Sequence, residues 1–154
     1  MNGLSKLEKQ WVLYDVGNSA FTMMVSTIIP IYFKNIASAG AISLSDSTAF
    51  WGYAVSISTI IIAVLGPILG TLADTKGYKK PLFAAFMMLG ALGCAGLSLP
   101  LSWIIFLSVF IIAKVGFSGS LIFYDSMLGD ITEDERMDKV SSNGYAWGYI
   151  GSCV

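Results

Sequence analysis

The sequence contains no histidine, only two cysteines and few charged residues. Charged side chains make up 12% of its 154 residues and hydrophobic ones 55%, whereas an average soluble domain carries roughly 25% charged residues. A water-soluble fold of this composition would lack the polar side chains needed to cover its surface. The shortage disappears if lipid surrounds most of the chain.

The other absences exclude several classes of function. Without histidine, and without an H-E-x-x-H or G-x-S-x-G motif, the chain offers no metal or triad chemistry. We therefore expect no enzyme, no metal and no cofactor; an intramembrane aspartyl pair of Asp15 and Asp125 is the least favoured alternative. The net charge of −1 and the lack of a basic run exclude a nucleic-acid partner. Cys94 and Cys153 lie in apolar or glycine-rich stretches and are interpreted as packing residues.

Long hydrophobic runs dominate what is present. A helix needs about 20 mostly apolar residues to cross a hydrocarbon core ~30 Å thick. A fifth run begins near residue 142 and continues for only about a dozen residues, so we expect an incomplete chain. The pattern predicts an all-α membrane protein with four complete transmembrane helices plus the start of a fifth. The complete spans are expected at residues 11–33, 48–73, 81–99 and 102–127.

The lysines and arginines predict the orientation. If the four spans are correct, Lys34 falls on one side of the membrane and the other basic residues near span ends fall on the opposite side. Those residues are Lys6, Lys9, Lys76, Lys79, Lys80, Arg136 and Lys139. The positive-inside rule then places the N-terminus in the cytoplasm, and we expect a bacterial inner membrane or its equivalent.

Polar residues are concentrated in the first and fourth spans. Asp15, Ser19, Thr22 and Ser26 are spaced four, three and four apart, which puts them on one helical face with Asn18 beside it. The fourth span contains two ionisable residues, Lys114 and Asp125. Ionisable groups inside lipid are costly and usually face a cavity or one another. Six of these residues, all but Ser26, are predicted to form a substrate or proton cavity; the alternatives are a structural ion pair of Asp15 with Lys114, or carboxylates hydrated at the interface.

Small residues form stripes of a second kind. In the second span they recur three or four apart and include Gly52, Ser56 and Gly66, and Gly144 and Gly148 repeat the spacing in the fifth. Such stripes allow another helix to approach closely. We expect these five residues to serve helix packing, either static or at an interface that slides during gating.

Two helix starts are also predicted from capping residues. Ser45 or Ser47 is expected to cap the second helix, and the Thr132–Glu135 spacing indicates a capping box.

A motif at residues 70–80 carries a family resemblance. The sequence Gly-Thr-Leu-Ala-Asp-Thr-Lys-Gly-Tyr-Lys-Lys closely resembles the G-x-x-x-D-x-x-G-x-[RK]-[RK] signature between spans two and three of the major facilitator superfamily. In that superfamily the aspartate engages the end of a helix in the second half of the transporter as part of a gate. The resemblance implies a gating loop formed by Gly70, Asp74, Gly77, Lys79 and Lys80; an ordinary polar turn is the alternative.

Residues 11–21, 123–125 and 140–151 narrow the resemblance. They are similar to the branch that includes the autophagy-linked vacuolar amino-acid effluxers and their bacterial relatives. Two positions depart from the expected pattern, because Asp125 replaces an asparagine and Lys114 replaces the arginine common in the fourth span.

The resemblance implies a secondary active transporter that moves a small solute, such as an amino acid, by alternating access. Protons are the coupling ion it suggests, and the expected partners are the lipid bilayer and a missing C-terminal half. A non-transporting tetraspan scaffold or interaction protein is the alternative, and it would predict a chain that stops after the fourth span.

Overall fold

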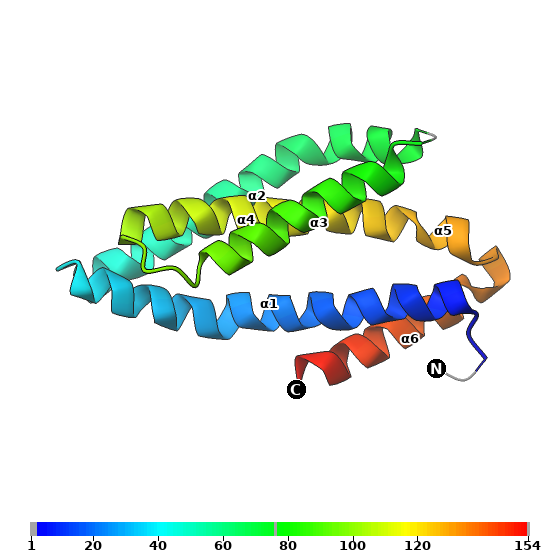
Figure 1. Cartoon of the computed structure of the whole chain (residues 1–154), viewed down its shortest axis with the longest axis horizontal. Coiled ribbons are helices and arrows are strands. Elements are labelled where there is room, and N and C mark those ends of the chain that lie inside the picture. Colours follow the sequence, from blue (N-terminus) through cyan, green and yellow to red (C-terminus); the bar gives the residue numbers. More distant parts are fainter. Residues whose placement is uncertain (1–2, 76, 154) are drawn as a thin grey trace. The chain divides into compact units, whose positions relative to one another are not determined.

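The computed structural model describes residues 3–75 and 77–153, and every regular element in these ranges is helical. Lys76, counted above for orientation, lies outside the described residues. The all-α fold class is confirmed. Along the chain the elements are α1 (Lys6–Ala39), α2 (Leu44–Asp74), α3 (Lys79–Gly96), α4 (Trp103–Ser126), α5 (Leu128–Ile131) and α6 (Asp134–Ser152) (Figure 1).

Three of the described helices, α1, α2 and α4, are long and apolar enough to cross a membrane. With 34, 31 and 24 residues, they extend about 51, 47 and 36 Å at 1.5 Å per residue. α3 has 18 residues, or about 27 Å, and begins with two lysines, so the span expected at 81–99 stays a prediction. α6 begins at Asp134, ahead of the fifth apolar run, because hydropathy marks where apolar residues start and not where the backbone turns helical.

The first two long helices begin with side-chain caps. Ser5 and Glu8 form a capping box at the start of α1: the Ser5 backbone N–H donates to Glu8 Oε2 at 2.6 Å, and the Glu8 N–H donates to Ser5 Oγ at 3.3 Å. α2 is capped by Ser43, whose Oγ accepts from the Asp46 N–H at 3.1 Å. The expectation of Ser45 or Ser47 is therefore wrong, because the helix begins one turn earlier.

The predicted capping box at Thr132 and Glu135 is also wrong. The N-cap of α6 is Glu133, which makes no side-chain capping hydrogen bond. Thr132 instead donates its hydroxyl to Glu8 Oε1 at 2.8 Å. The Thr132 hydroxyl therefore bonds to Glu8, 124 positions away in sequence, and not to the start of α6 as the local pattern predicted.

The described chain divides into two compact units, residues 3–30 with 127–153 and residues 31–126. In the second unit α4 packs along both α2 and α3 (Figure 1). The α3–α4 contact is close at Gly90 and Gly116, where a Cβ on Gly116 would lie 2.5 Å from the Gly90 backbone nitrogen. Small residues thus bring the two backbones together, as in many membrane helix pairs.

Aromatic rings fill the interior of the second unit near one end of α4. Phe33, Phe106 and Phe110 are each at most 1% exposed. The ring of Trp51 lies 4.3 Å from that of Phe110 and 5.8 Å from that of Phe33. These contacts tie the last part of α1 to α2 and α4.

In the first unit α6 lies along the N-terminal part of α1 (Figure 1). Leu4, Val12 and Val140 form its buried core, with Trp11 and Trp147 packed against them. The glycines of α6 allow this approach, because a Cβ on Gly144 would lie 2.8 Å from the Trp11 ring. This helix pair positions the candidate site.

Candidate functional site

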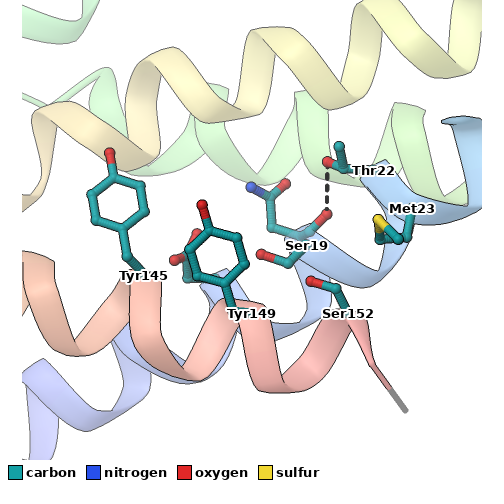
Figure 2. A pocket seen from close by; sticks show the side chains of 8 residues that line it. Ser19, Thr22, Met23, Tyr145, Tyr149 and Ser152 are labelled. Carbon is teal, nitrogen blue, oxygen red and sulfur yellow. Dashed lines mark hydrogen bonds between the residues drawn. The ribbon is translucent and has the colours of Figure 1, made fainter.

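A cavity of about 300 Å³ opens along α1 and α6 in the first unit. From α1 it is lined by the four polar residues that the sequence placed on one face, Asp15, Asn18, Ser19 and Thr22, together with Met23. From α6 it is lined by Tyr145, Tyr149 and Ser152 (Figure 2). The structure therefore brings together four of the six residues predicted for a substrate or proton cavity.

The carboxylate of Asp15 rests against the glycine face of α6. Its Oδ2 lies 3.3 Å from the position of a Cβ on Gly144 and 3.2 Å from that of a Cβ on Gly148. A Cβ on Gly148 would also lie 2.7 Å from Ser19 Oγ. The two glycines thus leave the room that these polar side chains of α1 occupy.

Two of the hydroxyl groups at the site already donate hydrogen bonds. Thr22 Oγ1 donates to the backbone oxygen of Asn18 at 3.1 Å, and Ser152 Oγ donates to that of Gly148 at 2.8 Å. Within the described residues Asn18 Oδ1 is buried and has no hydrogen-bond partner. A buried carbonyl without a donor is unusual and costs free energy unless something supplies one.

The sequence reasoning missed the residues that α6 contributes. Tyr145 and Tyr149 are four positions apart, and each directly follows one of the packing glycines, Gly144 or Gly148. Figure 2 shows both rings on one face of α6, opposite the polar side chains of α1. They are 68% and 74% exposed. The i, i+4 spacing was the available signal, but it does not say which helix lies opposite.

The other two predicted cavity residues belong to the second unit. Lys114 lies midway along α4 and is half-buried. Asp125 lies at the end of α4 and is exposed. Asp15 belongs to the other unit, so its pairing with Lys114 stays a prediction.

The small-residue stripe of α2 is open. In the described part of the chain, no atom lies within 4 Å of a Cβ built on Gly52, Gly66 or Gly70, and Ser56 is exposed. Gly144 and Gly148 of α6, with the same spacing, lie directly against α1. The packing role expected for the α2 stripe stays a prediction.

The loop predicted to gate joins α2 to α3. Asp74 is the last residue of α2 and is exposed, and Gly77 has φ +90°, a backbone conformation that favours glycine. Lys79 Nζ donates to the backbone oxygen of Ser126 at 3.1 Å, at the C-terminal end of α4. A cation stabilises the negative end of the helix dipole there. Lys80 is exposed.

A second polar cluster holds the start of α1. Glu8 is 2% exposed and accepts a hydrogen bond from the Thr132 hydroxyl. It also accepts one from Arg136 Nη2 at 2.9 Å, and this second contact is an ion pair. Arg136 Nη2 also donates to the Gly3 backbone oxygen at 2.9 Å. Glu8 precedes the apolar stretch of α1, which begins at Trp11. The Ser5 N–H, and then the Thr132 hydroxyl, hold the pKa of Glu8 below its ordinary value of 4.5.

Comparison with known proteins decides the family. Residues 44–136 match the family described as "Vacuole effluxer Atg22 like", which is more than half of the chain. The chain belongs to this Atg22-like family. The matched region runs from the start of α2 through the first turn of α6 and contains the 70–80 loop, Lys114 and Asp125.

A curated relative agrees with that assignment. The "Uncharacterized MFS-type transporter YxiO" of Bacillus subtilis (strain 168) is 43% identical over 157 aligned positions, which cover 100% of this chain and 37% of the relative. The chain therefore spans just over a third of the relative's length. No solved structure matches. As a member of this Atg22-like, major-facilitator-type family with three described helices suited to a bilayer, the chain is an integral membrane protein rather than an enzyme.

Proposed function

We propose that the chain is part of a secondary active transporter that moves a small polar solute, such as an amino acid, by alternating access. One observation carries the proposal: α1, a helix long and apolar enough to cross a membrane, presents Asp15, Asn18, Ser19 and Thr22 to a cavity of about 300 Å³. A carboxylate in a membrane helix is costly unless it faces a cavity or a partner. The volume is at the lower end of the range typical of small-molecule sites.

The names of the matched proteins support this function. The family is described as an effluxer and the Bacillus subtilis relative as a transporter. In the proposed mechanism protons are the coupling ion and the N-terminus faces the cytoplasm. The second half of the transporter is contributed by sequence beyond these 154 residues, and the 70–80 loop gates against it. The Lys79 contact with Ser126 supports a gate in which this loop moves together with α4.

The test is transport by the full-length protein reconstituted in liposomes. Uptake of radiolabelled amino acids is measured with and without a proton gradient, for the wild type and for Asp15→Asn and Lys114→Met. We expect gradient-dependent uptake that both substitutions reduce at least about tenfold, the loss that removing a charge-assisted contact brings. Ser26→Ala is the control, because Ser26 lies one turn beyond Thr22 and does not line the cavity. Normal transport by both variants would refute the role of these two residues.

A further inference from the structure

We infer that the cavity along α1 and α6 recognises a protonated amine, the –NH₃⁺ group of a small organic solute. This rests on the proposed function and names the chemical group that the site takes. The charge of the lining is the first reason. Of the described lining residues, Asp15 is the one charged at neutral pH, and it is negative; none is basic. A carboxylate attracts a cation and repels an anion.

The hydrogen-bonding capacity left at the site is the second reason. Thr22 and Ser152 already donate to backbone carbonyls, so their oxygens remain as acceptors. Asn18 Oδ1 is a buried acceptor without a donor among the described residues. An ammonium group has three donors and no acceptor. It would therefore donate to Asp15 and to these hydroxyl oxygens together, and a turn of the Asn18 side chain would bring Oδ1 to it as well, whereas a carboxylate guest has no donor to offer any of these acceptors.

The aromatic pair is the third reason. Tyr145 and Tyr149 present two rings to the same cavity from one face of α6 (Figure 2). A cation over an aromatic face is attracted by the negative charge of the π-system. A bare divalent metal fits less well, because it requires several oxygen ligands at short range and no cluster of three metal-binding side chains is found among the residues that the structure describes.

The experiment measures binding to the purified full-length protein through its melting temperature, since a ligand that binds the folded state raises it. The probe is ethylammonium chloride, compared with sodium chloride and sodium acetate at equal ionic strength. The variants are Asp15→Asn, Tyr149→Leu and Tyr149→Phe. Asp46→Asn is the control, because it makes the same change at an exposed carboxylate in the first turn of α2.

We expect ethylammonium alone to raise the melting temperature of the wild type and of Asp46→Asn. Asp15→Asn should weaken the apparent affinity about tenfold or more. Tyr149→Leu should weaken it about 2- to 30-fold, and Tyr149→Phe much less because it keeps the ring. A shift with acetate, an equal shift with sodium, no shift with ethylammonium, or an ethylammonium shift retained in Asp15→Asn would each overturn the inference.

The two proposals fail separately. If the liposomes show solute transport but ethylammonium does not bind, the transporter function stands and the amine site is refuted. If ethylammonium binds through Asp15 but no solute crosses the membrane, the recognition site stands and transport is refuted.

Discussion

Replacing Gly148 by alanine should disturb both the α1–α6 pair and the cavity beside it. The added Cβ would lie 2.7 Å from Ser19 Oγ and 3.2 Å from Asp15 Oδ2. The nearer contact falls about 0.7 Å short of ordinary van der Waals separation, so α6 or both side chains must move. Overpacking of this kind costs about 1–3 kcal/mol, offset by about 1 kcal/mol of improved helix propensity. The expected net destabilisation is about 0–2 kcal/mol.

Gly52→Ala is the matched comparison, because it makes the same change within a helix where no described atom lies within 4 Å of the new Cβ. It gains the propensity without the clash, so the two variants should differ by about 1–3 kcal/mol. Gly148→Ala should therefore have the lower melting temperature of the two. The assay is thermal unfolding of the full-length protein in detergent, followed by tryptophan fluorescence. If Gly148→Ala is as stable as Gly52→Ala, the close α1–α6 packing described above is incorrect.

Three further predictions concern the polar contacts and the loop. Glu8→Gln should lower the melting temperature. The fold lowers the pKa of Glu8, so the ionised carboxylate stabilises the folded protein above pH 4.5. The difference in melting temperature from wild type should therefore stay constant from about pH 6 to pH 8 and narrow as the pH falls below 4.5. Lys79→Met should lower the free energy of unfolding, measured by chemical denaturation, by about 0.3–1 kcal/mol, because the interaction with the end of α4 is lost. Lys80→Met, at an exposed position, should lower it less. Equal effects would contradict the Ser126 contact. Gly77→Ala should destabilise by about 1–2 kcal/mol because its φ is +90°, and unchanged thermal stability would show that the loop readily adopts another conformation.

What the sequence predicted well depended on properties of single helices. Hydropathy identified the long helices because burial in lipid requires a continuous apolar run. The helical period placed Asp15, Asn18, Ser19 and Thr22 together because one helix carries all four. Neither inference required knowledge of which helices are neighbours.

What the sequence did not predict depends on contacts between distant segments. Tyr145 and Tyr149 join the cavity only because α6 packs on α1, whereas the equally spaced glycines of α2 have no such neighbour among the residues that the structure describes. Thr132 does not cap α6 because Glu8 accepts its hydrogen bond. The serines at positions 43–47 are similar candidates locally, and the starting residue of α2 decides that Ser43 is the cap.

The Glu8 cluster also constrains the order in which the protein is assembled. Glu8 and Arg136 are 128 residues apart. The first unit contains both ends of the described chain, and all residues of the second unit lie between them in the sequence. At about 5–20 residues per second, the ribosome needs roughly 6–26 s to make Arg136 after Glu8. During that interval the start of α1 lacks the guanidinium and hydroxyl that later surround its carboxylate. The cavity needs both α1 and α6, so it can form only after the ribosome has made α2, α3 and α4.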